Sequence, residues 1–99
     1  MTRLGPNAER QLDKLIAHYE WIDRPEATVN LIRAMRRAVE RIDRSPDAGL
    51  PAPRPYPELA ALGFRWIMQG TYWFAYRHEQ GESVIVGVFH ASADIPNRA

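Results

Sequence analysis

Residues 63–69 read GFRWIMQ, residues 72–78 read YWFAYRH, and residues 83–90 read SVIVGVFH. Aromatic and β-branched residues fill these three runs, and glycine-containing segments at residues 70–71 and 79–82 separate them. This composition is typical of short β-strands joined by tight turns. The last third of the chain, from Gly63 to Asp94, is therefore predicted to be built around an antiparallel strand meander at residues 63–90.

Two amphipathic helices are predicted before the meander, within residues 6–44. Apolar residues recur with helical spacing at residues 8–22 and again at residues 27–42. Pro6 suits an early helical position, and Asn7 is predicted to cap the start of the first helix. Asp23 with Glu26 has the spacing of a capping box that starts the second. The joint is short, so the two helices are predicted to form an antiparallel hairpin.

The segment between helices and strands is rich in proline. Residues 45–57 hold five of the eight prolines, which predicts a stiff, extended and exposed connector. Residues 58–62 fit either a helical turn or the entry to a strand, and the tail after His90 is predicted to leave the sheet and fray. The chain of 99 residues is interpreted as a single α+β domain, in which the helical hairpin packs on a three- to four-stranded antiparallel sheet.

The charge and composition of the chain argue against several classes of function. The formal net charge is +1, which gives no strong non-specific attraction to nucleic acid. There is no cysteine, and the three histidines lack metal-ligand spacing, so no metal or cofactor is expected. No apolar run approaches the length of a membrane helix and no signal peptide is recognisable, which predicts a cytoplasmic protein without membrane contact.

The strands carry more apolar surface than one helical hairpin covers. In residues 72–78, Tyr72, Phe74 and Tyr76 share one face, and Trp73 with Arg77 lies on the other. Strict alternation in residues 83–90 gives two apolar faces, with valines 84, 86 and 88 opposite Ile85 and Phe89. Either a partner protein or the connector and a terminus must cover the second face.

The order of elements and several residues resemble the RelE/ParE superfamily, the toxins of bacterial type II toxin–antitoxin modules. The resemblance extends from Leu4 to Asp94. The residues that carry it are Phe64-Arg65, the runs 72–77 and 84–90, Ala8 with Leu12, Glu26-Ala27, Ser45-Pro46 with Gly49, and His90 with Asp94.

The resemblance implies two helices on a twisted antiparallel sheet, with a strand just before the first helix. Gly5-Pro6 leaves little room for that strand, so it is expected to be short or missing and the sheet edge more exposed. The resemblance also implies a cognate antitoxin, whose extended segment wraps the toxin.

The superfamily divides into two activities. RelE-like members cut mRNA on the ribosome, whereas ParE-like members inhibit DNA gyrase. Arg65 and His90 are the candidate catalytic residues for RNA cleavage, but each also fits a structural role, because a guanidinium alone supplies no acid–base pair. The tail after His90 resembles the ParE-like ending, and the low net charge argues against a nuclease.

We therefore predict a ParE-like toxin that binds and inhibits a target such as DNA gyrase, with growth inhibition and plasmid stabilisation as the expected biology. Three alternatives remain open from the sequence. These are a ribosome-dependent mRNA endonuclease using Arg65 and His90, a non-toxic interaction module of the same fold, and an unrelated small α+β domain.

Candidate partner-binding residues lie on the second helix and the strands. Arg33, Arg37, Arg41 and Arg44 form a stripe along the second helix, which is either a docking surface or a solvated face paired with Glu40 and Asp43. The predicted partner-binding set has six members. It takes three arginines from this stripe and three residues from the strands: Arg33, Arg37, Arg41, Arg65, Trp73 and Arg77.

Overall fold

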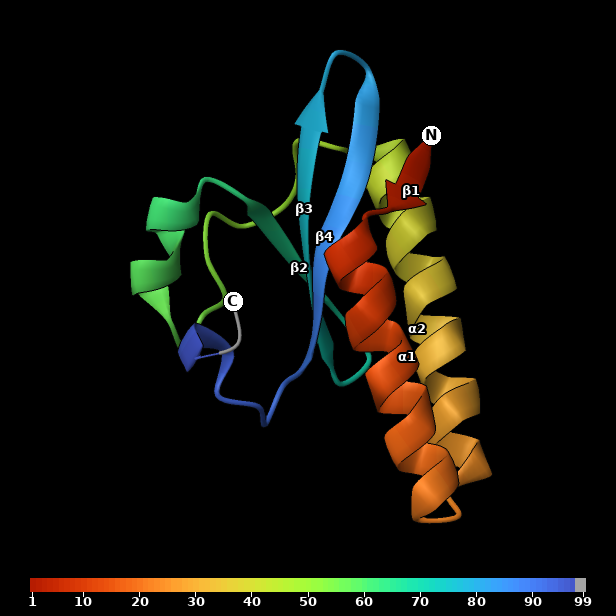
Figure 1. Cartoon of the computed structure of the whole chain (residues 1–99). Coiled ribbons are helices and arrows are strands. Elements are labelled where there is room, and N and C mark those ends of the chain that lie inside the picture. Colours follow the sequence, from red (N-terminus) through yellow and green to blue (C-terminus); the bar gives the residue numbers. More distant parts are fainter. Residues whose placement is uncertain (98–99) are drawn as a thin grey trace.

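In the computed structural model, which describes residues 1–97, two helices pack against one face of a four-stranded sheet (Figure 1). The strand order is β1-β4-β3-β2, and two short 3₁₀ helices lie on the other side of the sheet. The elements are β1 Thr2–Leu4, α1 Pro6–Trp21, α2 Pro25–Arg44, η1 Pro57–Leu62, β2 Arg65–Gln69, β3 Tyr72–Glu79, β4 Glu82–His90 and η2 Ile95–Asn97. The predicted α+β fold with its helical hairpin is confirmed.

Proline begins both long helices, at Pro6 and Pro25, because its fixed φ suits the first helical turn. The predicted side-chain caps are wrong. Asn7 lies inside α1, and its amide donates across to the Val86 carbonyl (3.0 Å). Asp23 takes a left-handed conformation (φ 54°) in the turn between the helices, and no side chain caps α2.

The main core lies between the helices and the sheet. As expected, Tyr72, Phe74 and Tyr76 face the helices, where they meet apolar residues of both. In β4, however, Ile85 and Val88 face the helices together, which strict alternation forbids. A bulge in the pairing of β3 with β4 places one extra residue in β4 and reverses the alternation beyond it. The predicted parity of residues 83–90 therefore holds through Val86 and is wrong from Gly87 onward.

The chain itself covers much of the second face of the sheet. Trp66, Trp73 and Phe89 form a second core with η1 and the tail. Most residues of the connector are exposed as predicted, but Pro53 is fully buried. The tail does not fray as predicted, since Ile95 is buried in this core. Of the two alternatives for the apolar second face, coverage by the connector and the tail accounts for most of it.

Part of the backbone at each edge of the sheet is already hydrogen-bonded to other segments of the chain. The short β1 pairs in parallel with residues 83–85 of β4, whereas the other strand pairs are antiparallel as predicted. Beyond β1, Asn7 binds the Val86 carbonyl and the Gln11 side-chain oxygen accepts the Val88 N–H (2.8 Å). At the β2 edge, Leu50 and Trp66 exchange two backbone hydrogen bonds of 2.7 Å. The expected short first strand is present, but α1 covers the edge that it leaves open.

Candidate functional site

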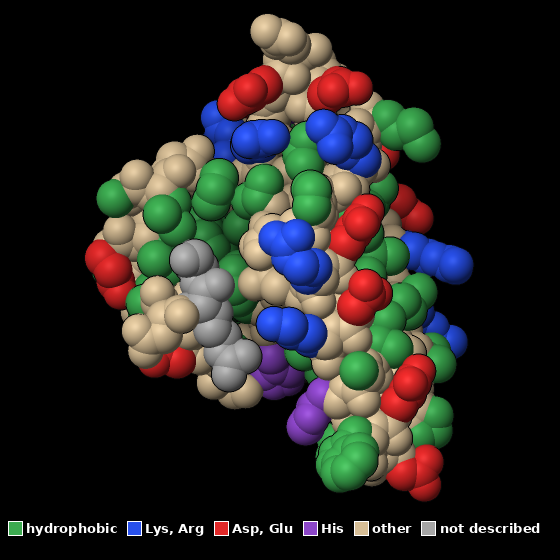
Figure 2. All heavy atoms as spheres, in the orientation of Figure 1, with side chains coloured by type: hydrophobic (Ala, Val, Ile, Leu, Met, Phe, Trp, Pro, Cys, Tyr) green, Lys and Arg blue, Asp and Glu red, His purple; other side chains and the backbone are tan. Residues whose placement is uncertain are grey.

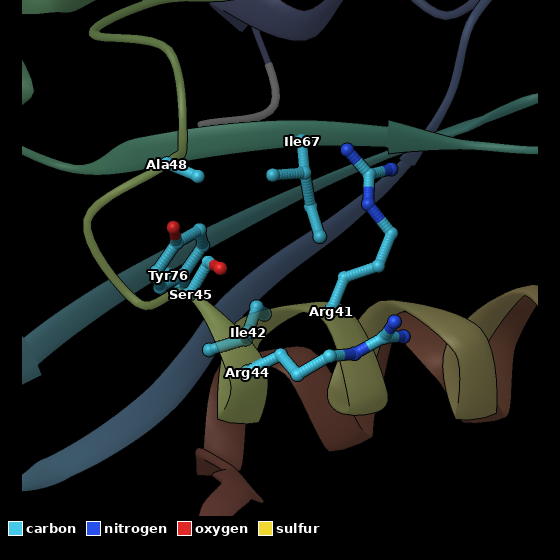
Figure 3. A pocket seen from close by; sticks show the side chains of 7 residues that line it. All are labelled: Arg41, Ile42, Arg44, Ser45, Ala48, Ile67 and Tyr76. Atoms are coloured by element: carbon cyan, nitrogen blue, oxygen red, sulfur yellow. The ribbon is translucent and has the colours of Figure 1, made fainter.

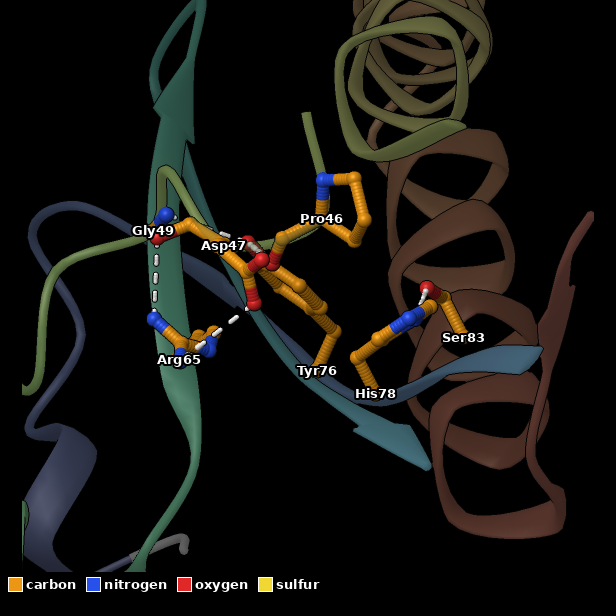
Figure 4. A network of polar contacts seen from close by, with 7 residues as sticks. All are labelled: Pro46, Asp47, Gly49, Arg65, Tyr76, His78 and Ser83. Carbon is orange, nitrogen blue, oxygen red and sulfur yellow. Dashed lines mark hydrogen bonds and ion pairs between the residues drawn. The ribbon is translucent and has the colours of Figure 1, made fainter. Parts of the chain in front are cut away.

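Arg65 anchors the start of the connector (Figure 4). Its guanidinium donates to the Asp47 carbonyl (2.9 Å) and lies 3.6 Å from the Asp47 carboxylate. That carboxylate is 84% exposed, so the ion pair adds little stability, and the geometric constraint on the connector matters more. These contacts match the structural role foreseen for this arginine.

The buried hydroxyl of Tyr76 completes the anchor. It donates to the Pro46 carbonyl (2.8 Å) and accepts the Gly49 N–H (3.1 Å). Burial raises the pKa of Tyr76, although the Gly49 bond and the Arg65 charge oppose this shift. The hydroxyl therefore stays protonated and serves as a fixed structural link rather than as a proton-transfer group.

His90 lies far from this anchor. Arg65 pairs with Tyr76 across one side of β3, and His90 pairs with Tyr72 across the other. Four residues of extended strand separate the two tyrosines, about 13 Å at 3.3 Å per residue. Arg65 and His90 therefore do not converge on one reacting group.

Instead, His90 shares a groove with α1, which we call the α1–β4 groove. This groove has a volume of about 320 Å³ and is lined by Gln11, Lys14, Leu15, His18, Val88, Phe89, His90 and Ala93. Figure 2 shows two histidines next to each other on this side of the molecule, below basic side chains that gather over α1. The sequence reasoning found no partner for His18 and overlooked Lys14, although the two are one helical turn apart.

The arginines of α2 separate into two environments. Arg33 and Arg37 line a groove of about 340 Å³ together with Gln69 and Thr71, here called the α2–turn groove. Arg41 instead donates to the Met68 carbonyl (2.7 Å) and the Gln69 side chain (3.2 Å), and so fixes the end of β2.

Arg41 also borders a smaller cavity of about 210 Å³ between the end of α2 and β2 (Figure 3). The carboxylates expected to pair with the stripe do not do so among the described residues. Asp43 accepts a hydrogen bond from the Thr2 hydroxyl (2.6 Å), and the ion pairs found within residues 1–97 involve other arginines.

The remaining predicted partner-binding residues do not join the α2–turn groove. Trp73 is only 3% exposed beneath the connector, so its indole is part of the second core rather than of a free surface. Arg77 is exposed near the β3–β4 turn. The six residues predicted as one set are therefore spread over several surfaces.

One apolar hollow remains on the second face, and sequence reasoning did not locate it. This second-face cavity has a volume of about 350 Å³ and is lined by Asn7, Leu62, Phe64, Trp66, Ala75, Val86, Gly87 and Phe89. Figure 2 shows hydrophobic side chains gathered there, between η1 and α1. A Cβ atom on Gly87 would lie 2.6 Å from the Phe89 ring, so glycine is required for this ring position.

Within residues 1–97, no three histidine or carboxylate side chains gather closely enough to hold a metal ion. None of the helices in the described part of the chain has the length and apolar character needed to cross a bilayer.

The same fold occurs in proteins of known structure. Solved structures similar to it include the chromosomal ParDE toxin–antitoxin system from P. aeruginosa and the toxin–antitoxin complex RelBE2 from Mycobacterium tuberculosis. The first has a TM-score of 0.69 at 18% identity and covers 92% of this chain and 95% of the other. The second has a TM-score of 0.59 at 28% identity and covers 91% of this chain and 95% of the other.

A search of curated protein sequences found no match. The family described as ParE toxin of the type II toxin–antitoxin system parDE, by contrast, matches residues 3–95. That match includes both helices, all three long strands and the residues that anchor the connector. This chain is therefore a member of the ParE toxin family of type II toxin–antitoxin systems.

Proposed function

We propose that this toxin acts by binding and inhibiting a protein target, with DNA gyrase as the candidate, rather than by cleaving RNA. The observation that carries the proposal is the separation of Arg65 from His90 on opposite sides of β3. RNA cleavage needs an acid, a base and phosphate-stabilising cations around one phosphodiester. The contacts of Arg65 with Asp47 are those of a structural residue.

Gyrase is the target that the ParE-like resemblance implies, and a supercoiling assay tests it. The purified toxin is expected to inhibit gyrase, and an Arg65→Ala/His90→Ala variant with an unchanged circular dichroism spectrum is expected to inhibit equally. The competing candidate, a ribosome-dependent mRNA endonuclease, predicts cleaved mRNA in a translating extract and loss of cleavage in this variant. If expression of the toxin leaves bacterial growth normal, both toxin proposals fail and a non-toxic interaction module remains.

The proposed partner that neutralises the toxin is a cognate antitoxin with an acidic, extended segment. The two solved structures named above are a ParDE toxin–antitoxin system and a RelBE2 toxin–antitoxin complex. Arg33 and Arg37 are exposed and line one groove, and arginine binds carboxylates in a two-pronged geometry. The second-face cavity offers an apolar seat for a side chain of the same wrapping segment.

The antitoxin is expected to bind in the α2–turn groove and the second-face cavity more than along the edges of the sheet. Trp66 already exchanges backbone hydrogen bonds with Leu50, and α1 side chains bind Val86 and Val88 at the opposite edge. An added strand would have to displace these contacts first.

Charge reversal tests the acidic segment. The neighbouring gene product is co-purified with the toxin, and its affinity is measured by calorimetry. Arg33→Glu/Arg37→Glu is expected to weaken binding about tenfold or more, because each lost charge-assisted bond contributes roughly 1.5–3 kcal/mol. The matched control, Arg36→Glu/Arg44→Glu, makes the same change in net charge at exposed positions outside the groove. If both variants weaken binding equally, the effect comes from the overall charge of the toxin, and the α2–turn groove does not bind the acidic segment.

Leu62→Asp tests the apolar seat. Leu62 is 43% exposed and lines the second-face cavity, so a carboxylate there leaves the toxin folded but opposes an apolar side chain. Unchanged affinity of this variant for the antitoxin would exclude the cavity from the interface.

A further inference from the structure

The α1–β4 groove combines cationic and apolar side chains in one hollow. Lys14 and His18 reach it from α1, and His90 reaches it from the end of β4. None of its lining residues is acidic. Arg10, Lys14 and His18 follow one another at intervals of four residues, so the basic face of α1 continues toward the groove. We infer that this groove binds the phosphate of a nucleotide.

His90 is held in place for such a role. Its Nδ1 atom accepts the Ser92 backbone N–H (3.1 Å) and lies 2.7 Å from the Ser92 hydroxyl. Its ring packs edge-on against Tyr72, with centroids 5.4 Å apart and planes at 87°. Because Nδ1 is an acceptor, the neutral ring carries its proton on Nε2, which is then available as a donor.

Gln11 supplies a further donor to the groove. Its side-chain oxygen is occupied by the Val88 N–H (2.8 Å), which fixes the orientation of the amide. The amide NH₂ group is left to donate. Lys14, an N–H of each imidazole and this amide together place several donors around the groove, which suits an anion with several oxygens.

The chemistry favours a nucleotide phosphate over a carboxylate peptide. No arginine lines this groove, whereas arginine is the residue that grips carboxylates in a planar pair of bonds. Lysine binds phosphate as a point charge. Val88 and Phe89 are almost fully buried, so a base would lie against the half-buried Leu15 and Ala93. The volume of about 320 Å³ lies at the small end of ligand sites, which fits one nucleotide.

Two sources of this phosphate are possible, a free mononucleotide and the phosphorylated end of a nucleic acid. The inference rests on neither gyrase inhibition nor the antitoxin proposal. The groove shares no lining residue with the α2–turn groove and only Phe89 with the second-face cavity, and its donor side chains belong to neither. Its test therefore measures binding alone.

The experiment is a titration of the ¹⁵N-labelled protein by NMR with AMP, adenosine, inorganic phosphate, and a trinucleotide with or without a 5′-phosphate. We expect saturable shifts at Lys14, His18 and residues 88–93 with AMP, and none with adenosine. Binding of AMP without the phosphorylated trinucleotide indicates a free nucleotide, and binding of both indicates a nucleic-acid end. Shifts of equal size with adenosine and AMP, or equal affinity for inorganic phosphate and AMP, would overturn the assignment.

Variants locate the site. Lys14→Met/His18→Asn is expected to weaken AMP binding by about tenfold or more, through two lost charge-assisted contacts. Both residues are exposed on α1, so the fold is retained, and the NMR spectrum itself checks this. Arg36→Met/Arg44→Asn on α2 is the matched control, and His90→Gln probes the strand side independently. Unchanged binding in both groove variants, or tighter binding of an acidic peptide than of AMP, would refute the site.

Discussion

Replacing Tyr76 by phenylalanine removes one oxygen atom that two backbone groups of the connector use. The Pro46 carbonyl and the Gly49 N–H both bind the Tyr76 hydroxyl, and the ring is fully buried. Each buried polar group left unpaired costs roughly 1–3 kcal/mol. The adjoining cavity of about 210 Å³ gives water a route to one of the two groups, so we expect a total loss of about 2 kcal/mol.

Thermal and urea unfolding measure this loss. For a domain of this size, about 2 kcal/mol lowers Tm by roughly 8–16 °C. Tyr56→Phe is the matched control, because the Tyr56 hydroxyl makes a long contact of 3.4 Å with the Ala93 carbonyl and its loss is expected to cost under about 0.5 kcal/mol. If Tyr76→Phe is no less stable than Tyr56→Phe, the hydroxyl does not hold the connector and the reasoning fails.

Two further predictions follow from the same region and its neighbour. Gly49→Ala is expected to destabilise by about 1–3 kcal/mol in urea unfolding, since its Cβ would lie 2.6 Å from the Tyr76 hydroxyl and 2.8 Å from Arg65 Cβ. A loss of stability below about 0.5 kcal/mol would show that the connector shifts readily to make room for the added methyl group. Burial, with the Tyr19 hydroxyl as a smaller cause, raises the pKa of Tyr72, and burial raises the pKa of Tyr76. Above pH about 10 the unfolded chain releases tyrosine protons that the folded chain keeps, so stability is fully present below that pH and falls as pH rises; a flat stability profile from pH 9 to 11.5 would contradict these shifts.

The order of elements could be predicted because each carries a strong local pattern. Aromatic and β-branched runs separated by glycine give the three long strands, and helical spacing of apolar residues gives the hairpin. The bulge between β3 and β4 has no comparable local signal. Val86 and Gly87 read as ordinary strand residues, so the faces of the residues beyond Val86 could not be assigned by alternation.

The coverage of the second face also depends on contacts distant in sequence. A proline-rich connector ordinarily indicates exposure, but Pro53 is fully buried. Ile95 of the tail is buried in the second core with Trp66 and Trp73 from remote strands. Tertiary packing therefore overrides composition here. The surplus of apolar residues was visible in the sequence, whereas the identity of what covers it was not.

The candidate sites were predicted in part. Arg65 binds the Asp47 carbonyl, as expected for the structural role that was one of its two predicted roles. Arg33 and Arg37 line the same groove, as their spacing on α2 suggests. The meeting of Lys14 and His18 with His90 joins positions more than 70 residues apart, and only the packing of α1 along β4 reveals it.

The central claim is that this toxin works by binding its target, and the supercoiling activity of purified DNA gyrase tests it most directly. The assay compares wild-type protein with the Arg65→Ala/His90→Ala variant, both checked for folding. We expect both proteins to inhibit supercoiling at the same concentration. Inhibition by binding is contradicted if the wild-type protein leaves supercoiling unchanged while it cleaves mRNA in a translating extract and the double variant does not.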